Sequence, residues 1–312
     1  MRHTLFCVGS VLVSLLLAAI SLRYVTHTWL LALIYSFQVH FALAALAASL
    51  ILLLVKRHWY AYMLVTVAVV LLGHGILMLK AFEAAPAAAA ATSRPILRLM
   101  SFNIENDNFE NGARIADAML ASGADVVNIL EAAPLKSEIP RLSKTYPYHI
   151  GCGVGTDGCD TLIFAKQPFL DQSVRSIGDL WPNRLVQVAI DFAGTRVNFV
   201  SVHLAKPYFD DFQVDELGDL KDIVAAIDGP LLLAGDFNSA IIDPHIQDFV
   251  RTSGLNTIFP EPSTWPIKAG KIGIAIDHVL ARPPLRLTAV TQIEDNDGSN
   301  HFGLMAEIAI DR

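Results

Sequence analysis

An apolar run at residues 231–240 ends in Gly-Asp-Phe-Asn, which places Asp236 and Asn238 where a buried strand stops. Two residues apart on an extended backbone, the carboxylate and the amide would point the same way. At the carboxyl end of a strand, such a pair can hold a water molecule and a phosphoryl oxygen together. The same residue types also close strands with Asx-type turns, so this motif alone leaves a turn and a catalytic pair equally open.

Polar, metal-capable side chains recur where other apolar runs finish. His203 ends one run, Asp277 lies in another, and His301 precedes the last. Upstream, Asn103 and Glu131 close the first two strands expected beyond the hydrophobic start. Open α/β sheets place their sites at such strand ends, so the recurrence favours a catalytic pair over a simple turn.

The ordered motifs Ser-Phe-Asn, Leu-Glu, Val-His-Leu, Gly-Asp-Phe-Asn, Ile-Asp-His and Ser-Asn-His resemble those of the endonuclease/exonuclease/phosphatase superfamily. The resemblance covers about residues 96–312. It implies an α/β fold, namely a DNase I-like four-layer sandwich of two mixed β-sheets flanked by helices. It also implies metal-dependent hydrolysis of a phosphate ester.

The resemblance gives each matching residue an expected role. Asp236 would orient or deprotonate the attacking water, and Asn238 would hydrogen-bond the phosphate. Asp277 would fix the tautomer of His301 and raise its pKa, so that the imidazole can hold charge against phosphoryl oxygens. His203 would supply a second imidazole, either as a donor to a non-bridging oxygen or as an acid to the leaving group.

Glu131 is the ligand that the resemblance implies for a divalent cation, with Asn103 nearby. Oxygen donors of this kind suit Mg²⁺ or Mn²⁺. The family usually has Asp before the last His, and this chain has Asn300 there. One negative ligand is therefore missing, although Asn300 could itself contribute to a metal site. We expect weaker metal affinity or no second ion, and a catalytically weak phospholigand-binding protein stays open as an alternative.

Arg184 and Trp265 are weaker, substrate-side candidates. Arg184 could reach a phosphate or could be a surface residue near the start of a strand. Trp265 lies in a segment that resembles the family's substrate-side loop, but a tryptophan there could equally plug the core.

Cys152 and Cys159 bracket a glycine-rich tip and could close a disulfide or remain free thiols; a metal pair is less favoured because no Cys or His cluster accompanies them.

Strands and helices alternate beyond residue 95, with a hairpin among the crossovers, which indicates mixed sheets. The patterns predict strands at 96–103, 125–130, 160–165, 185–192, 196–203, 230–234, 274–282, 285–293 and 302–310, and helices at 113–122, 137–144, 210–227 and near 244–252.

The first eighty residues are strongly apolar and account for a mean hydropathy of +0.45 over the whole chain. Apolar runs at 4–22, 29–55 and 59–79 approach or exceed the ~20 residues that cross a bilayer. Splitting the second run would leave each part too short, so we expect three transmembrane helices.

The chain is thus expected to hold a membrane domain at 1–83, an Ala/Pro linker at 84–95 and a catalytic domain at 96–312. Basic residues in short loops slightly favour a cytoplasmic N-terminus. Three crossings would put the catalytic domain on the outer face of a bacterial cell membrane, and a disulfide is natural in that compartment.

The catalytic half is acidic, with 18 Lys and Arg against 29 Asp and Glu from Arg94 onward. Long nucleic acids are bound through Lys and Arg, so we expect no stable nucleic-acid complex. The expected partners are the bilayer and a phosphorylated substrate, either lipid-linked or a nucleotide. We predict a membrane-anchored phosphoesterase that acts on a lipid-linked phosphate or pyrophosphate, with an extracytoplasmic nuclease as the alternative.

Overall fold

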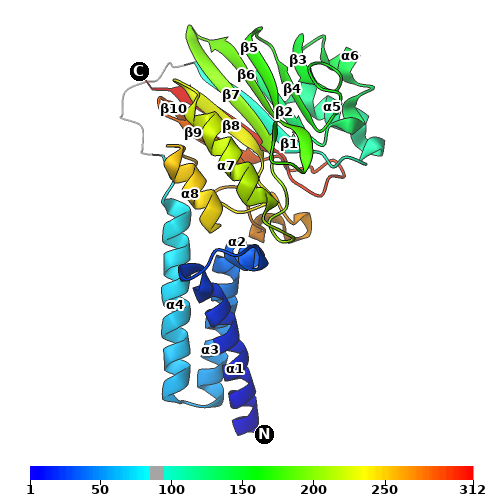
Figure 1. Ribbon diagram of the computed structural model, residues 1–312. Helices are drawn as coiled ribbons and strands as arrows, with labels where there is room; N and C mark the ends of the chain where they lie inside the picture. Colours follow the sequence, from blue (N-terminus) through cyan, green and yellow to red (C-terminus); the bar gives the residue numbers. More distant parts are fainter. Residues whose placement is uncertain (85–94, 312) are drawn as a thin grey trace.

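The structure is a computed structural model that describes residues 1–84 and 95–311 (Figure 1). Long helices stand at one end of the molecule, with the N-terminus at their far tip, and an α/β domain stands at the other. Most of the expected linker at 84–95 lies outside the described residues.

Three of the N-terminal helices are long and apolar enough to cross a membrane: α1 (Arg2–Ser21), α3 (Gln38–Val55) and α4 (Trp59–Lys80). The expected three long apolar helices are therefore confirmed in the described residues, and their length and composition indicate membrane anchoring. The second apolar run, expected as one span over 29–55, is instead broken.

The break in the second run lies at Phe37. Before it come a 3₁₀ turn, η2 (Trp29–Leu31), and a short helix, α2 (Ala32–Ser36), and only α3 is long enough to span. Ser36 and Gln38 flank the break, and both direct polar side chains to partners outside their own helices. A buried polar side chain is stable only with such a partner, so these contacts stabilise the break between α2 and α3.

Two mixed β-sheets form the centre of the α/β domain. The six-stranded sheet has the order β10-β11-β1-β2-β4-β3, and the five-stranded sheet has the order β5-β6-β7-β8-β9. The first sheet contains β1 (Ile96–Asn103), β2 (Val126–Leu130), β3 (Tyr148–Gly151), β4 (Thr161–Ala165), β10 (Leu285–Gln292) and β11 (Leu304–Ile310). The second contains β5 (Phe169–Ile177), β6 (Trp181–Phe192), β7 (Thr195–His203), β8 (Leu231–Asp236) and β9 (Asp277–Arg282).

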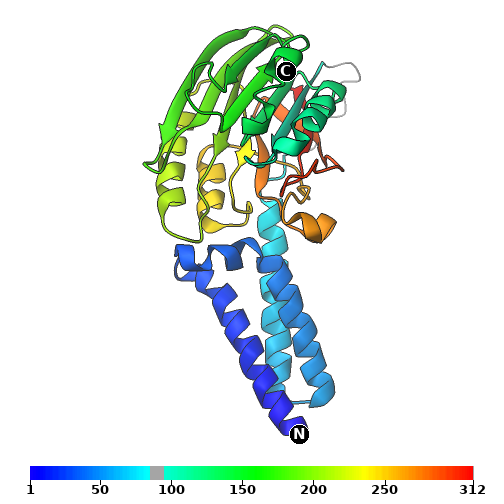
Figure 2. The same ribbon diagram turned by 90° about the vertical axis from the view of Figure 1, so that its right-hand side faces the viewer.

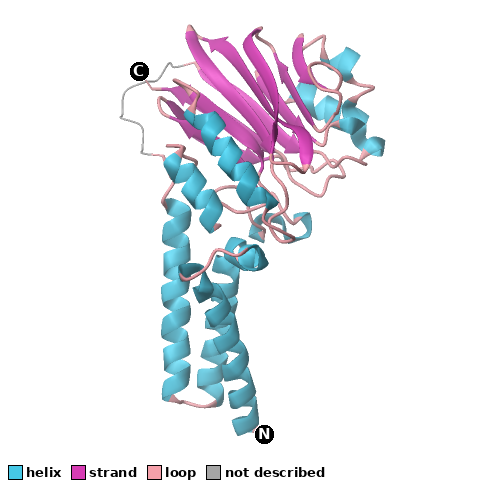
Figure 3. Cartoon of the chain, in the orientation of Figure 1, coloured by secondary structure: helices cyan, strands magenta, loops and turns pink. Residues whose placement is uncertain are grey.

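Helices cover the outer face of each sheet (Figures 2 and 3). The helices α5 (Gly112–Ala121) and α6 (Ile139–Leu142) pack on the six-stranded sheet, and α7 (Phe212–Ala225) and α8 (Pro244–Thr252) pack on the five-stranded sheet. A further apolar core, with Leu99, Val188 and Phe199 among its members, fills the space between the sheets. The expected four-layer DNase I-like sandwich is confirmed.

Two strands of the domain were not predicted, and others begin elsewhere than expected. Most residues of β5 are exposed or half-buried, so this edge strand lacks the apolar alternation on which the prediction depended. The strand β3 has only 4 residues, too few to show a strand pattern in the sequence. The strand expected from residue 274 begins at Asp277, because Ile274 and Ile276 pack with the N-terminal helices instead.

Strand direction brings the expected site residues to one edge. The pair β1 and β2 is parallel, and so is the pair β7 and β8, whereas β9 runs antiparallel to β8. The carboxyl ends of four strands and the amino end of β9 therefore meet, as the site requires.

Candidate active site

Six of the side chains expected in the site converge at this edge. Asn103 ends β1, Glu131 follows β2, His203 ends β7, Asp236 ends β8, Asp277 begins β9, and His301 lies in the loop before β11. Hydrogen bonds and short ionic contacts link all of them.

Asp236 is the centre of the cluster and is only 1% exposed. Its Oδ2 accepts a hydrogen bond from Asn103 Nδ2 at 3.0 Å, and its Oδ1 accepts one from the backbone N–H of Asn238 at 2.7 Å. Burial raises the pKa of Asp236, and the neighbouring Asp277 carboxylate adds to the rise, against the opposing effect of the two nearby histidines.

The Asp236–Asn238 contact is an Asx-type turn, and it lies within the candidate cluster. The turn that the motif left open is therefore present, and it is compatible with the predicted catalytic pair. Asn238 has a left-handed backbone (φ 50°) rather than the extended conformation expected. Its side-chain Nδ2 donates to the carbonyl of Leu204 at 2.9 Å, which fixes the orientation of the amide.

The glycine of the motif is required by close packing between strands. A Cβ atom on Gly235 would lie 1.8 Å from the carbonyl oxygen of Val202 on β7. Only glycine lets β8 approach β7 this closely just before Asp236.

His301 and Asp277 form the expected dyad. His301 Nδ1 lies 2.8 Å from Asp277 Oδ2, and Nε2 lies 3.8 Å from Asp236 Oδ2. Burial opposes a charge on the imidazole, but the carboxylates of Asp277 and Asp236 outweigh it and raise the pKa of His301 to about 9.

His203 has an equivalent partner, Asp160, which the sequence analysis missed. His203 Nδ1 lies 3.1 Å from both carboxylate oxygens of Asp160, and Nε2 lies 3.8 Å from Asp236 Oδ2. Burial opposes a positive charge on His203, but Asp160 outweighs it and raises the pKa of His203. Burial also disfavours a negative charge on Asp160, but His203 and Arg184 outweigh it and lower the pKa of Asp160. The available signal was an Asp immediately before a buried strand.

The two imidazoles thus flank Asp236 in matching ways. Each has Nδ1 paired with a carboxylate, and each places Nε2 at 3.8 Å from the same oxygen of Asp236. Carboxylates at Nδ1 fix the tautomer and favour imidazolium, so both rings can donate from Nε2 to an anionic group. The arrangement suits a phosphate bound beside a buried carboxylate.

Glu131 provides a more open carboxylate. Its Oε1 accepts from Asn103 Nδ2 at 3.1 Å and its Oε2 from the N–H of Asn106 at 2.8 Å, and the side chain is 28% exposed. The left-handed backbone of Glu131 (φ 54°) is uncommon for this residue type and is found most often at functional sites.

The carboxylates of Glu131 and Asp236 fit a hard cation, and Asn103 bridges them by donating from Nδ2 to both. The Asn103 amide oxygen instead accepts from the N–H of Glu105, so Asn103 positions these carboxylates and does not turn its oxygen toward them. Asp236, Asp277 and His301 also lie close enough together to hold a metal ion. In that cluster His301 Nδ1 is paired with Asp277, and Nε2 is the nitrogen that faces Asp236. Asn300, the further candidate ligand, is exposed.

A cavity of about 530 Å³ opens over the cluster. Its polar lining includes Glu131, Asp160, Arg184, His203, Lys206 and Asn238. Arg184 stacks on the Trp181 ring at 5.2 Å and lies 3.5 Å from Asp160, so it faces the cavity and not the surface. Trp265 instead packs against Phe37 of the N-terminal region, with ring centres 6.2 Å apart.

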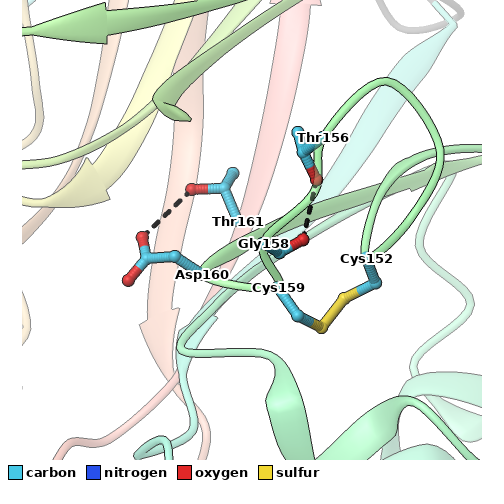
Figure 4. The surroundings of a disulfide bond; sticks show 6 residues. All are labelled: Cys152, Thr156, Gly158, Cys159, Asp160 and Thr161. Atoms are coloured by element: carbon cyan, nitrogen blue, oxygen red, sulfur yellow. Dashed lines mark hydrogen bonds between the residues drawn. A yellow bond between two sulfur atoms is a disulfide. The ribbon is translucent and has the colours of Figure 1, made fainter. Parts of the chain in front are cut away.

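The Cys152–Cys159 disulfide closes a loop immediately before Asp160 (Figure 4). Within the loop, Thr156 Oγ1 donates to the carbonyl of Gly158 at 2.7 Å. The residue that orients His203 therefore follows directly on a covalently closed turn.

Residues 100–301 match the Endonuclease/Exonuclease/phosphatase family. A comparison with curated proteins finds no match. Among solved structures, the chain is similar to D. rerio TDP2 complexed with a single-strand DNA product, at 19% identity and a TM-score of 0.57, covering 68% of this chain and 98% of that one.

Two bacterial structures show the same likeness. One is the beta toxin of Staphylococcus aureus with bound magnesium ions, at 16% identity and TM-score 0.53, covering 70% of this chain and 100% of that one. The other is sphingomyelinase C of Streptomyces griseocarneus, at 17% identity and TM-score 0.51, covering 68% and 99%. At these identities the likeness establishes the fold.

Proposed function

Because the chain belongs to the endonuclease/exonuclease/phosphatase family and is a metal-dependent phosphoesterase of that family, we propose that its substrate is a membrane amphiphile with a phosphate or pyrophosphate headgroup. The enzyme would hydrolyse this headgroup at the surface of the bilayer that holds its apolar helices.

The observation that carries this proposal is the contact between the catalytic loops and the end of the helix bundle. A small hollow beside Asn238 is lined on one side by Leu33 and Ser36, from the break in the second apolar run, and on the other by Tyr208 and Ile276. A candidate catalytic residue therefore shares its surroundings with residues at the end of the apolar helices. A substrate phosphate in this site would lie at headgroup depth.

The mouth of the main cavity supports the same substrate class. Leu180, Trp181 and Phe209 line it and are 38%, 50% and 69% exposed, respectively. Large exposed apolar side chains beside a cavity are typical of a binding surface for an apolar group. Arg184 and Lys206 add two positive charges for the headgroup.

The chain's own residues would carry out the hydrolysis as follows. Asp236 orients the attacking water and accepts its proton, for which a raised pKa is suited. His203 and His301 donate from Nε2 to the phosphoryl oxygens and to the leaving oxygen. Asn238 donates to the phosphate without adding negative charge. Mg²⁺ or Mn²⁺ held by Glu131, whose carboxylate Asn103 orients, would neutralise charge on the phosphoryl group.

The test uses the full-length protein in detergent micelles with Mg²⁺ or Mn²⁺, supplied separately with polyprenyl phosphate, polyprenyl pyrophosphate, a phospholipid panel and plasmid DNA. We expect phosphate release from an amphiphile and its loss, by about 10²–10⁴-fold, in Asp236→Ala. Cleavage of DNA alone would refute the substrate class. Inactivity of a folded protein on every substrate would favour the phospholigand-binding alternative.

A further inference from the structure

A buried contact joins two segments that are far apart in the sequence. The connector, residues 22–37, runs from the end of α1 to the start of α3. The catalytic loop, residues 237–243, follows Asp236 and contains Asn238. Polar contacts from three residues of the connector, Arg23, His27 and Ser36, reach this loop and the helix after it.

Arg23 places a charged group in one of these buried contacts. It is 5% exposed, and its guanidinium donates through one nitrogen to Gln38 Oε1 and through the other to the carbonyl of Ile242 at 2.8 Å. The Tyr35 ring covers the guanidinium at 5.6 Å. A buried guanidinium requires such partners, so Arg23 and the Ile242 carbonyl hold each other in place.

Ser36 holds the same loop two residues earlier. The backbone N–H of Ala240 donates to Ser36 Oγ at 3.2 Å, and both residues are buried. From within the catalytic domain, His278 Nε2 donates to the carbonyl of Ser239 at 2.9 Å. The loop is therefore fixed at residue 239 by its own domain and at residues 240 and 242 by the connector.

The helix after the loop is tied down as well. Asp243 caps α8 by accepting from the N–H of His245 at 2.9 Å. The ring of His245 in turn bonds the carbonyl of His27 in the connector through Nε2, at 2.8 Å.

We propose that Arg23 and Ser36 are positioning residues of the active site, which hold the catalytic loop and, through it, Asn238. The N-terminal region then completes the site as well as anchoring it. This inference rests on the proposed function only in giving Asn238 a role toward the phosphate. A contact that merely joined the two regions would affect stability and leave the turnover of the folded protein unchanged.

Loop order is measured by hydrogen exchange on the full-length protein in phospholipid nanodiscs, which requires no substrate. In Arg23→Met and Ser36→Ala we expect amides of residues 237–246 to exchange at least tenfold faster, with amides of β1 unchanged. Arg57→Met, at the far turn of the helix bundle, and Ser21→Ala, whose hydroxyl bonds only within α1, are the matched controls. Unchanged protection of residues 237–246 would overturn the proposal.

Positioning is measured by kinetics and by binding of inorganic phosphate in the presence of Mg²⁺. We expect Arg23→Met to lower kcat about tenfold. Ser36→Thr should retain activity because it keeps Oγ. Guanidinium added to the buffer should restore part of the activity that Arg23→Ala loses. A loosened loop with unaltered kcat and phosphate affinity would overturn the proposal. If the wild type hydrolyses no amphiphile, the proposed function fails, while exchange and phosphate binding still decide this inference.

Discussion

At the scale of single residues, the site consists of two imidazoles that are held by carboxylates on either side of Asp236. The sequence pointed to His301 and Asp277 because both lie in motifs of the family. It did not reveal Asp160, because β4 and β7 belong to different sheets and only sheet packing brings Asp160 to His203, 43 residues away. The local signal, an Asp immediately before a buried strand, does not identify His203 as its partner.

Asp160→Asn tests the missed partner. The variant keeps the shape of the side chain but removes the charge that favours protonated His203, so His203 loses its proton at lower pH than in the wild type. We expect kcat/KM to fall about 10–100-fold, with the alkaline limb of the pH profile displaced to lower pH. Asp157→Asn, an exposed position on the same loop, should match the wild type. Identical pH profiles for Asp160→Asn and the wild type would remove Asp160 from the site.

His278 forms a second buried pair behind the cluster. Its Nε2 donates to the Ser239 carbonyl and its Nδ1 lies 2.8 Å from Glu261 Oε1, so two acceptors require the ring to carry both protons. Burial alone would lower the pKa of His278, but the Glu261 carboxylate raises it above the usual 6.5. Both ring nitrogens of His278 are thus engaged within the fold, as in a structural residue.

Glu261→Gln is expected to destabilise the fold in a pH-dependent way. Below pH 6.5, His278 is charged in the folded and the unfolded protein, and the pair stabilises the folded state fully. This stabilisation is lost as the pH rises through the raised pKa of His278 in the folded protein. We expect the variant to lose about 1.5–3 kcal/mol at pH 6 and less at alkaline pH. Thermal unfolding across pH measures the difference; a constant difference would contradict the charged pair.

At the scale of elements, the strands that carry the site were predictable and the edges of the sheets were not. The buried β1, β2, β7 and β8 are rich in apolar residues, and a polar residue ends or directly follows each of them, whereas β5 is a largely exposed edge. Burial requires apolar side chains, so a strand leaves a clear apolar pattern in the sequence only where its faces are covered.

Gly235→Ala tests the close approach of β7 and β8. The added Cβ would lie 1.8 Å from a backbone oxygen, so the two strands must separate next to Asp236. We expect a loss of about 1–3 kcal/mol in unfolding free energy, together with reduced activity. Gly218→Ala in α7 is the control, because its Cβ would meet no heavy atom within 4 Å and should stabilise the helix by about 0.5–1 kcal/mol. Equal effects of the two substitutions would contradict the strand-packing argument.

The disulfide loop before β4 should stabilise the protein and the site together. Closing so short a loop stabilises by about 2 kcal/mol in the chain-entropy model. Replacing both Cys152 and Cys159 with Ser should lower the melting temperature and, through Asp160, kcat. Cys7→Ser controls for the loss of a thiol. A variant with wild-type kcat would show that Asp160 is held without the disulfide.

At the scale of the whole molecule, contacts at several places in the described residues join the domain to the helix bundle, among them His40 of α3 with the carbonyl of Ile272. The connector contacts the catalytic loop, and beyond α4 the backbone of Phe82 and Ala84 pairs with Thr257. The turn at residues 56–58 lies at the opposite end of the bundle (Figure 1). The number of helices was predictable from hydropathy, but the break at Phe37 was not, because its polar partners come from a distant part of the chain.

Single cysteines test on which side of the membrane the domain lies. In a Cys7→Ser background we expect Lys144→Cys, on the catalytic domain, to react with an impermeant maleimide in intact cells. Arg57→Cys should react only after permeabilisation, because it lies beyond the opposite end of the bundle. Permeabilised cells, in which both sites should react, provide the control. The reverse labelling pattern would place the active site in the cytoplasm.

The contact between the catalytic loop and the connector has a kinetic consequence. A site held at a fixed height on the helix bundle meets its proposed substrate by diffusion in two dimensions, within the plane of the lipid. Its rate should then follow the mole fraction of substrate in the bilayer and not its bulk concentration. Adding inert lipid at constant total substrate would slow the reaction, which is the surface dilution typical of an interfacial enzyme.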